Sequence, residues 1–380
     1  MNDHTPDYHI GLNAHLLSDQ AGYRRAGIHS YIAHTLEALP AADPTLRYTV
    51  FVGAGSPPEH PAFQVRRAAL PTASPPLRIL WEQIAQPWQT RGLDLLHGMA
   101  FATPVICPVP TVVTVYDLSF IFHPERLSAS RRAYLSTFTG RSVQHARRVI
   151  AISASTARDI TRVFGVPEDR IDIARPGVGP EFKPLDSDAV EAFRARMDLP
   201  PHFILHVGTL EPRKNLPVLL EAYARLPESL RAEVPLVLVG GKGWGLDELW
   251  GTVLRLGVDR NIRLEGYAPD EDLPLWYNAA TLLVYPSVYE GWGMPVVEAL
   301  ACGTPALVSD ISSLPEAAGD AGLRLNPHSV EAWAAGLEQA LTDEAWRTEA
   351  IQRGLAHAAT LRWEHTAAVH AACYRRALES

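Results

Sequence analysis

Two kinds of hydrophobic pattern alternate along the chain: short aliphatic runs rich in β-branched residues, and longer amphipathic stretches with helical spacing. The short runs predict strands at Tyr8–Leu12, Tyr48–Val52, Leu93–Leu96, Thr111–Val115, Val149–Ile152, Phe203–Val207, Leu236–Val239, Ile262–Glu265, Leu282–Tyr285 and Ala306–Val308. The stretches between them predict helices that include Ile28–Leu39, Arg131–Ala146, Ala154–Phe164, Leu216–Leu226 and Val297–Ala301. Strands that alternate with helices form parallel sheets covered on both faces, so we predict an α/β protein with two Rossmann-like parallel-sheet domains.

The predicted domain boundary is a segment dense in helix-breaking residues, from Pro176 to Pro184. It divides the chain into an N-terminal domain at residues 1–183 and a C-terminal domain at residues 184–362. A final helix is predicted over Trp363–Leu378, within the remaining segment 363–380, and the pattern does not show which domain it joins.

The composition excludes several classes of protein. The chain has 380 residues, of which 47% are apolar and 20% charged, as is typical of a folded chain of about two domains. No apolar run approaches the roughly 18 residues that span a bilayer, and the N-terminus lacks the basic and apolar regions of a secretory signal, so we expect a cytoplasmic protein. The three cysteines, Cys107, Cys302 and Cys373, are too scattered for a disulfide framework or a thiolate metal site.

The net charge of −8 is unevenly shared along the chain. Up to residue 183 there are 18 Lys and Arg against 15 Asp and Glu, and the remaining residues have 16 against 27, so the two parts carry +3 and −11. Neither part has the concentrated basic face of a nucleic-acid-binding protein, and we expect no nucleic-acid partner.

The first candidate for chemistry is the segment from His206 to Asn215, which leaves a predicted strand, turns at Gly208 and brings Arg213 and Lys214 to the start of a helix. A helix N-terminus favours anions, and two adjacent cations there are suited to bind a diphosphate. The alternative is that both cations lie on a solvated loop.

The second candidate is the segment from Ser287 to Glu298, which follows the predicted strand Leu282–Tyr285. Its two glycines permit a tight turn, and Pro295 suits the first position of a helix, which would place Glu298 in the first turn. Carboxylates accept paired hydrogen bonds from vicinal diols such as those of ribose and hexoses, which makes Glu290 and Glu298 candidates for binding them. Helix capping would explain Glu298 alone.

Together these segments resemble the retaining glycosyltransferases of the GT-B fold, specifically glycosyltransferase family 4, whose signature is two glutamates separated by seven residues, here Glu290 and Glu298. The further segments that look like this family are Thr114–Ser119, Gly240–Gly245, Leu264–Tyr267, Ala301–Pro305 and Ser312–Glu316. The resemblance implies two Rossmann-like domains facing across a cleft, with the acceptor on the side of the N-terminal domain and the nucleotide-diphospho-sugar in the C-terminal domain.

The resemblance also implies roles for individual residues. Arg213 and Lys214 would neutralise the diphosphate as it leaves, Glu298 would bind the ribose, and Glu290 would bind the transferred sugar. Asp117 of the N-terminal domain would lie near that sugar, so the implied catalytic residues are Arg213, Lys214, Glu290 and Asp117. The implied donor-binding residues are Gly27, Gly208, Thr209, Gly266, Tyr267, Gly291, Trp292, Gly293, Met294, Pro295 and Glu298.

Two departures from the family pattern fall in the N-terminal domain. Tyr116 stands where the family usually has a histidine before the aspartate. Gly27, the implied phosphate-facing helix start, is followed by Ile28 and His29, whereas the family often has Gly-x-Gly. A buried structural tyrosine and a sugar contact are equally good interpretations of Tyr116.

Neither a metal nor a cofactor is expected. Asp186-Ser187-Asp188 and Asp270-Glu271-Asp272 match the Asp-x-Asp pattern of metal-dependent transferases, but both fall where helices are predicted to begin, so capping is the better interpretation. A basic stretch in the first half is most simply a solvated helix face, and the alternative is a contact with an anionic lipid-linked acceptor or with the inner face of a membrane. Its residues are Arg131, Arg132, Arg141, Arg147 and Arg148.

The sequence therefore predicts a retaining hexosyltransferase that acts without a metal. Similar chains with the segment from Thr209 to Asn215 are often described as mannosyltransferases, which makes GDP-mannose the first choice of donor; glucose, fucose and rhamnose donors stay open. The acceptor would be a glycan, a lipid-linked or a small-molecule hydroxyl. The alternatives are a nucleotide-sugar epimerase and a non-catalytic nucleotide-sugar-binding protein of the same fold.

Overall fold

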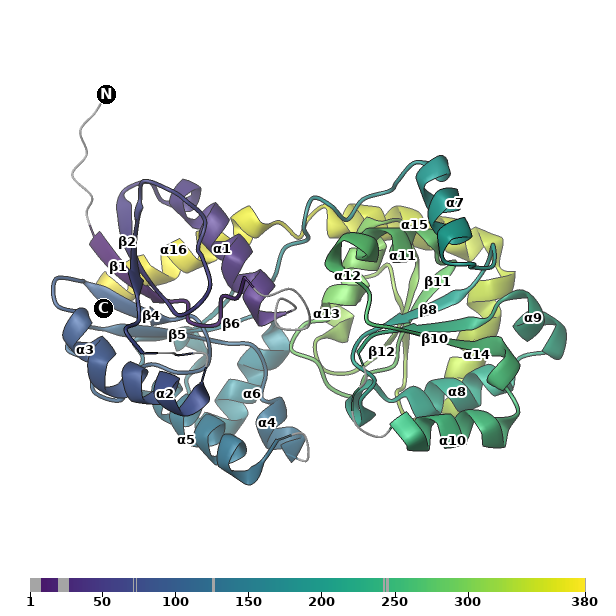
Figure 1. Cartoon of the computed structure of the whole chain (residues 1–380), viewed down its shortest axis with the longest axis horizontal. Coiled ribbons are helices and arrows are strands. Elements are labelled where there is room, and N and C mark those ends of the chain that lie inside the picture. Colours follow the sequence, from purple (N-terminus) through teal and green to yellow (C-terminus); the bar gives the residue numbers. More distant parts are fainter. Residues whose placement is uncertain are drawn as a thin grey trace. The chain divides into compact units, whose positions relative to one another are not determined.

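The computed structural model describes residues 8–19, 27–70, 72, 74–124, 127–241, 243 and 246–379. It consists of two compact units, each built around its own parallel sheet (Figure 1). Unit 1 comprises Met1–Gly177 and Arg362–Ser380, and unit 2 comprises Val178–Leu361. The chain therefore passes from unit 1 to unit 2 inside the Pro- and Gly-rich segment in which the sequence places the boundary, and its last helix belongs to unit 1.

Unit 1 has a seven-stranded parallel sheet with the order β3-β2-β1-β4-β5-β6-β7. Its strands are β1 (Tyr8–Asn13), β2 (Leu46–Val52), β3 (Phe63–Arg67), β4 (Leu95–Gly98), β5 (Thr111–Val115), β6 (Arg148–Ala151) and β7 (Ile171–Ile173). β1 and β4 are neighbours in the sheet, although β2 and β3 lie between them in the sequence. In open α/β sheets, ligands bind beside the carboxyl ends of the strands at such a switch point.

Helices cover both faces of this sheet. α1 (Ile28–Ala42) and α16 (Trp363–Glu379) pack on one face, and α5 (Ala129–His145) and α6 (Ala154–Phe164) pack on the other (Figure 1). A helical segment after β3 consists of α2 (Pro75–Leu80), the π-helical turn η1 (Trp81–Ala85) and α3 (Gln86–Gln89). Two further short elements among the described residues of this unit are α4 (Ser119–Phe122) and the 3₁₀ turn η3 (Glu168–Arg170).

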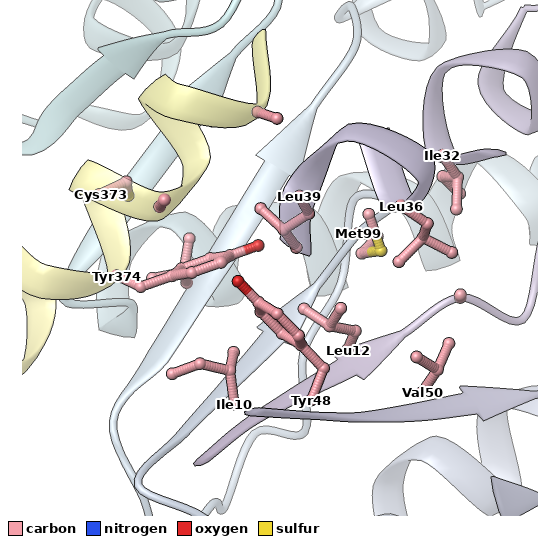
Figure 2. Close-up of a cluster of buried hydrophobic side chains, with 14 of the residues drawn as sticks. Ile10, Leu12, Ile32, Leu36, Leu39, Tyr48, Val50, Met99, Cys373 and Tyr374 are labelled. Atoms are coloured by element: carbon pink, nitrogen blue, oxygen red, sulfur yellow. The ribbon is translucent and has the colours of Figure 1, made fainter. Parts of the chain in front are cut away.

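One hydrophobic core of unit 1 lies between the sheet and the pair α1 and α16. Because side chains alternate across a strand, Tyr48 and Val50 of β2 enter this core, whereas Phe51 packs on the opposite face against Trp81. Figure 2 shows Tyr374 of α16 pointing into the core beside Tyr48. α16 is therefore an integral part of unit 1, which answers the question that the sequence pattern left open.

Unit 2 has a six-stranded parallel sheet with the order β10-β9-β8-β11-β12-β13, and its switch point lies between β8 and β11. Its strands are β8 (Ile204–Val207), β9 (Leu236–Val239), β10 (Ile262–Gly266), β11 (Leu282–Tyr285), β12 (Ala306–Ser309) and β13 (Leu323–Leu325). Its helices are α7 (Ser187–Arg196), α8 (Leu216–Ala224), α9 (Glu228–Glu233), α10 (Leu246–Leu256), α11 (Leu273–Ala279), α12 (Met294–Ala301), α13 (Leu314–Ala318), α14 (Val330–Thr342) and α15 (Glu344–Ala358). The 3₁₀ turns are η4 (Pro212–Lys214), η5 (Asp259–Asn261) and η6 (Asp270–Asp272).

The two predicted Rossmann-like sheets are confirmed, and every strand predicted from the sequence is present. The structure adds β3, β7 and β13, each at the edge of its sheet. These three strands are only partly buried, so they lack the continuous aliphatic run by which the central strands were recognised. In the part of the chain that the structure describes, no helix is both long and apolar enough to cross a membrane.

Candidate functional site

The two motifs singled out in the second half of the sequence meet at the switch point of unit 2. One motif follows β8 and the other follows β11, and these strands are hydrogen-bonded neighbours, so both loops leave the same edge of the sheet. The backbone ties the loops together, because the amide of Val288 donates to the carbonyl of Arg213 at 3.0 Å. The topology thus predicts a ligand site where these loops come together.

Arg213 and Lys214 lie in the 3₁₀ turn η4, and both side chains are buried. Asn215 ends the turn in the left-handed region, with φ of 56°, and its side-chain amide donates to the carbonyls of Pro286 at 3.2 Å and Pro327 at 2.7 Å. The turn is therefore fixed to the neighbouring loops. The alternative of two solvated cations on a loop is wrong.

Glu290 links the two cations. Its Oε2 lies 2.6 Å from Nη1 of Arg213, and its Oε1 accepts from Nζ of Lys214 at 2.7 Å. Arg213 also contacts Glu211, whose Oε1 lies 2.9 Å from Nη2, and Nζ of Lys214 also donates to the hydroxyl of Tyr285 at 2.6 Å. Two cations and two carboxylates thus form a compact, buried and formally neutral cluster.

The two cations of this cluster hold Glu290 in the ionised form. Burial alone would raise the pKa of Glu290, but the adjacent Arg213 and Lys214 outweigh it and keep that pKa well below its usual range. Burial lowers the pKa of the Lys214 amine, and the ion pair with Glu290 opposes that shift. A charge that is taken out of water is costly in free energy unless it is paired. Replacing one residue of the cluster by a neutral one would therefore leave its partner as an unpaired buried charge.

Glu298 occupies a separate environment on α12. Its Oε2 accepts a hydrogen bond from the hydroxyl of Tyr277 at 2.7 Å. Burial raises the pKa of Glu298 to about 7, and the nearby carboxylates of Glu181 and Asp270 add to the shift, while the bond from Tyr277 opposes it. A carboxyl group that titrates near neutral pH is typical of functional sites.

The expected position of Glu298 in the first helical turn is wrong. α12 begins at Met294, so Pro295 is its second residue and Glu298 lies beyond the first turn. The macrodipole effect falls off within the first turn, so helix capping no longer explains this glutamate. The bond to Tyr277 gives it a specific place instead.

Backbone geometry requires glycine at two of the implied donor-binding positions. Gly208 has φ of 154°, and a Cβ there would lie 3.3 Å from Cε of Lys214. Gly293 has φ of 128°, and a Cβ there would lie 2.9 Å from Cδ2 of Leu314. The lack of a side chain at Gly208 therefore lets its loop approach Lys214, and the lack of one at Gly293 lets its loop approach Leu314 of α13.

The remaining implied donor-binding residues of unit 2 differ in exposure. Trp292 is buried, and its ring nitrogen has no hydrogen-bond partner. Tyr267 is 48% exposed, and its hydroxyl donates to Asp270 at 3.3 Å. Thr209 is exposed, Gly291 is buried, and the residues of intermediate exposure are Gly266, Met294 and Pro295. Of the family-like segment Gly240–Gly245, Lys242, Trp244 and Gly245 lie outside the described residues.

Gly27 and Asp117 belong to unit 1. Gly27 precedes α1 with φ of 66°, and Asp117 follows β5 and accepts from the amide of Ser119 at 2.8 Å. Tyr116 is 6% exposed and its hydroxyl donates to the carbonyl of Met99 at 2.8 Å. Its ring lies edge-on to Tyr31, at 5.3 Å between centroids. Of its two interpretations, the buried structural tyrosine agrees with these contacts.

Sequence reasoning missed several residues that hold the cluster. Glu211 and Tyr285 contact the cations directly, and His206 is buried beside them with its pKa lowered to about 4 by burial and by the charge of Lys214. Ser312 and Ser313 both donate to the carbonyl of Glu290, at 2.6 and 2.9 Å. The strand-end position of Tyr285 marks it as a candidate, and the two serines begin the family-like segment Ser312–Glu316, to which the sequence assigned no role.

The acidic runs considered for a metal lie at helix starts, but the N-cap residues Asp186 and Asp272 make no side-chain capping hydrogen bond, so the capping interpretation is wrong for both. Asp186 precedes α7, and Asp270–Asp272 form the turn η6 directly before α11. Asp272 is paired with Arg196 at 2.6 Å. Within the described ranges, no group of three or more His, Cys, Asp or Glu side chains is arranged to hold a metal ion.

Comparison with family models gives two matches that together cover most of the chain. The model described as Glycosyltransferase Family 4 matches residues 25–182, and the one described as Glycosyl transferases group 1 matches residues 190–357. The first match extends from unit 1 a few residues into unit 2, and the second lies wholly within unit 2.

The chain is also similar to characterised enzymes. It is 38% identical over 283 residues to O-antigen chain mannosyltransferase B of Escherichia coli, an alignment that covers 74% of each chain. It is 34% identical over 283 residues to the serotype-specific mannosyltransferase WbdA of Escherichia coli, covering 72% of this chain but only 34% of that protein. D-inositol 3-phosphate glycosyltransferase 1 of Catenulispora acidiphila is 29% identical over 392 residues, covering 97% of this chain and 91% of the relative.

Solved structures show the same architecture. Sucrose-phosphate synthase from Thermosynechococcus elongatus aligns with a TM-score of 0.75 and 22% identity, covering 97% of this chain and 98% of that one. HepE of Anabaena in complex with UDP and glucose aligns with a TM-score of 0.70 and 19% identity, covering 97% and 99%. At these identities the likeness concerns the fold.

Proposed function

The chain belongs to glycosyltransferase family 4 and is a glycosyltransferase of the GT-B fold, and we propose that it moves a hexose from a nucleotide-diphospho-sugar to a hydroxyl acceptor with retention of configuration. Mannose is the first choice of sugar and GDP-mannose the first choice of donor, because the Escherichia coli relatives are mannosyltransferases. The acceptor would be a glycan, a lipid-linked saccharide or a small molecule.

The observation that carries this proposal is the buried cluster of Arg213, Lys214 and Glu290 at the switch point of unit 2. A diphosphate would pair with the two cations and replace Glu290 as their anion. Glu290 would then be released to accept hydrogen bonds from the hydroxyls of the sugar. Before the donor binds, the ion pairs with Glu290 would thus keep the cations ionised. Once the donor is bound, the same cations would pair with the diphosphate, which is the leaving group.

Negative charge on the diphosphate increases as the glycosidic bond breaks. Arg213 and Lys214 would therefore stabilise the transition state more than the bound donor, which is the condition for accelerating the reaction. The acceptor hydroxyl would attack the anomeric carbon on the face from which the diphosphate leaves, and a phosphate oxygen would take its proton. Two fixed cations would perform the charge neutralisation that a divalent metal performs elsewhere, so donor cleavage should persist in excess EDTA.

Glu298 is proposed to bind the ribose of the nucleotide. Its Oε2 is held by Tyr277, which leaves Oε1 to accept from a ribose hydroxyl. Donor atoms that bind the ionised carboxylate would lower its raised pKa, so nucleotide binding and ionisation of Glu298 would favour each other.

A peripheral contact of unit 1 with an anionic membrane surface is proposed as well. Leu80, Ile84 and Trp88 are spaced four residues apart along the segment α2–η1–α3 and are exposed, Trp88 to 67%. The guanidinium of Arg91 lies 4.7 Å from the ring centroid of Trp88, so a cation accompanies the apolar row. Ile84→Glu should reduce co-sedimentation with vesicles containing phosphatidylglycerol, and unchanged binding would contradict this contact.

A transferase differs from the alternative functions in its dependence on an acceptor. The full chain should release GDP from GDP-mannose faster when a manno-oligosaccharide acceptor is added, and the product should keep the α-configuration by NMR. A nucleotide-sugar epimerase would convert the donor without an acceptor, and a non-catalytic protein would bind but not cleave it. Thermal stabilisation by GDP, UDP and ADP, each tested separately, would identify the base, since ligand at 100 times its dissociation constant adds about 2.7 kcal/mol.

A further inference from the structure

The loop after β12 contacts the loop that contains Glu290. β12 pairs with β11 in parallel, so the loops that follow these two strands leave the same edge of the sheet of unit 2. The loop after β12 begins the family-like segment Ser312–Glu316, to which the proposed function assigns no role. A residue of this segment that contacts Glu290 can influence the charged cluster without belonging to it.

Ser312 is hydrogen-bonded to the backbone of Glu290 on both sides of its Cα atom. The Oγ of Ser312 accepts from the amide of Glu290 at 3.1 Å and donates to the carbonyl of the same residue at 2.6 Å. A hydroxyl has one proton and two lone pairs, so one serine side chain can form both bonds at once. Together the two bonds fix the backbone position from which the carboxylate of Glu290 extends.

Other groups hold the backbone on either side of Glu290. The buried Ser313 has its Oγ 2.9 Å from the carbonyl oxygen of Glu290 and 2.7 Å from that of Trp292. On the N-terminal side, Nη1 of Arg213 donates to the carbonyl of Tyr289. With its backbone held in this way, Glu290 can exchange the partners of its carboxylate only by rotating its side chain.

The backbone of Ser312 has an unfavourable conformation. Its φ is 62°, in the left-handed region that few residues with a Cβ adopt. Glycine would suit this backbone better but could not form the two bonds to Glu290. Unfavourable conformations of this kind persist where the surrounding structure enforces them, and they cluster at functional sites.

We propose that Ser312 is a positioning residue of the transferase reaction, whose hydroxyl keeps the backbone of Glu290 in place while the carboxylate turns from the two cations to the hydroxyls of the donor sugar. The exchange of partners rests on the proposed function, whereas the hold of Ser312 on the Glu290 backbone does not. In this scheme Ser312 acts only through Glu290. A displacement of the carboxylate by about 1 Å would be enough to impair catalysis about 100-fold.

Two substitutions separate the hydroxyl of Ser312 from its backbone conformation. Ser312→Ala removes the hydroxyl and keeps the unfavourable φ, whereas Ser312→Gly removes the hydroxyl and makes that φ acceptable. Both should lower kcat for sugar transfer from GDP-mannose about 10- to 100-fold, because Glu290 is then no longer held in place. The dissociation constant of GDP, measured by calorimetry, should stay within about threefold, because GDP lacks the sugar that Glu290 is proposed to bind.

The matched control is another serine of unit 2 whose hydroxyl bonds to a backbone amide. Ser329 caps α14 by accepting from the amide of Ala332 at 3.1 Å, so Ser329→Ala should lower thermal stability and leave kcat and GDP binding unchanged. If Ser312→Gly transfers sugar at the wild-type rate, the position requires only a left-handed backbone and the proposal is overturned. A loss of GDP affinity as large as the loss of kcat in both Ser312 variants also overturns it, because the whole loop would then have been disrupted.

Amide exchange separates failure of this proposal from failure of the proposed function. In the full chain, the Glu290 amide should exchange at least about tenfold faster in both Ser312 variants than in the wild type, and Ser329→Ala should not change it. Mass spectrometry with single-residue fragmentation measures these rates. Faster exchange in the Ser312 variants of a chain that transfers no sugar would refute the transferase and keep the hold of Ser312 on Glu290. Unchanged exchange and unchanged kcat in those variants of a chain that transfers sugar would refute the positioning role and keep the transferase.

Discussion

At the scale of single residues, the balance of charge around Glu290 predicts how Lys214 acts. Lys214→Ala should lower kcat about 100- to 1000-fold and weaken the binding of nucleoside diphosphate much less, because the lost group stabilises chiefly the charge that develops in the transition state. Steady-state kinetics and calorimetry measure the two effects. Arg255→Ala removes an exposed cation of the same unit and should change neither. A raised KM at unchanged kcat would show that Lys214 only binds the donor.

The raised pKa of Glu298 predicts a pH dependence of nucleotide binding. Oε2 of Glu298 is held by Tyr277, and a proton on the carboxyl group would compete with ribose for Oε1, so affinity for GDP should rise as the pH increases from 6 to 8, through the pKa of about 7. Glu298→Gln should bind GDP more weakly and lose that part of the pH dependence. Calorimetry with GDP at several pH values checks this, and Glu290→Gln is the matched control because its carboxylate is already ionised over this range. Equal losses in both variants would contradict the separate roles.

The limits of sequence-based prediction are visible at these same residues. Arg213, Lys214, Glu290 and Glu298 could be identified because each follows a recognisable strand and matches a motif. Tyr277 could not, because its hydrogen bond to Glu298 joins α11 to α12, and no local pattern encodes that contact. The roles assigned to all these residues stay predictions until the variants are measured.

At the scale of elements, burial decided which strands and helices could be predicted. β8, β9 and β11 are fully buried aliphatic runs, and their positions follow directly from composition. The edge strand β3 reads Phe-Gln-Val-Arg-Arg, a mixed pattern whose pairing with β2 depends on contacts distant in the sequence. The domain to which α16 belongs likewise could not be predicted, because an amphipathic helix can pack on the sheet of either unit.

Buried histidines attach α16 to the sheet of unit 1 and predict its response to acid. His370 contacts the hydroxyl of Tyr31 at 2.9 Å, and His97 contacts Tyr374 at 2.8 Å and Thr114 at 2.8 Å. Burial lowers the pKa of His370 to about 3 and places that of His97 well below its usual range. The folded state therefore keeps both rings neutral where the unfolded chain, titrating near pH 6.5, takes up protons.

Unit 1 should consequently lose stability as the pH falls below about 6.5, by about 1.4 kcal/mol per pH unit for each histidine that stays neutral. Hydrogen exchange in peptides from α16 and β4, corrected for intrinsic rates, measures the loss between pH 7 and pH 5. His370→Gln should reduce this slope, and His60→Gln, an exposed control in the same unit, should not. Protection that does not change with pH would show that these rings are not held neutral.

At the scale of the whole molecule, the two units are connected asymmetrically. Unit 2 is one continuous segment, and its ends adjoin, because the amide of Val178 donates to the carbonyl of Leu361 at 2.9 Å. Unit 1 is made of two segments and needs α16 to cover the core face that contains Ile10, Leu12 and Tyr48. Removal of residues 362–380 would expose that face, whereas excision of unit 2 would break no element.

This asymmetry predicts that residues 178–361 form an autonomous nucleotide-binding unit. Arg213, Lys214 and Glu298 all lie in it, so the isolated segment should bind GDP within about threefold of the full chain, because an independently folding domain keeps its own site intact. It should transfer no sugar, since Asp117, which the family resemblance implies to be catalytic, belongs to unit 1. Calorimetry and a transfer assay on the purified segment measure both properties, and residues 1–177 alone should fail to fold for lack of α16. Transfer by the isolated unit 2 would show that unit 1 contributes no essential part of the site, and loss of GDP binding in a folded unit 2 would move the nucleotide site elsewhere.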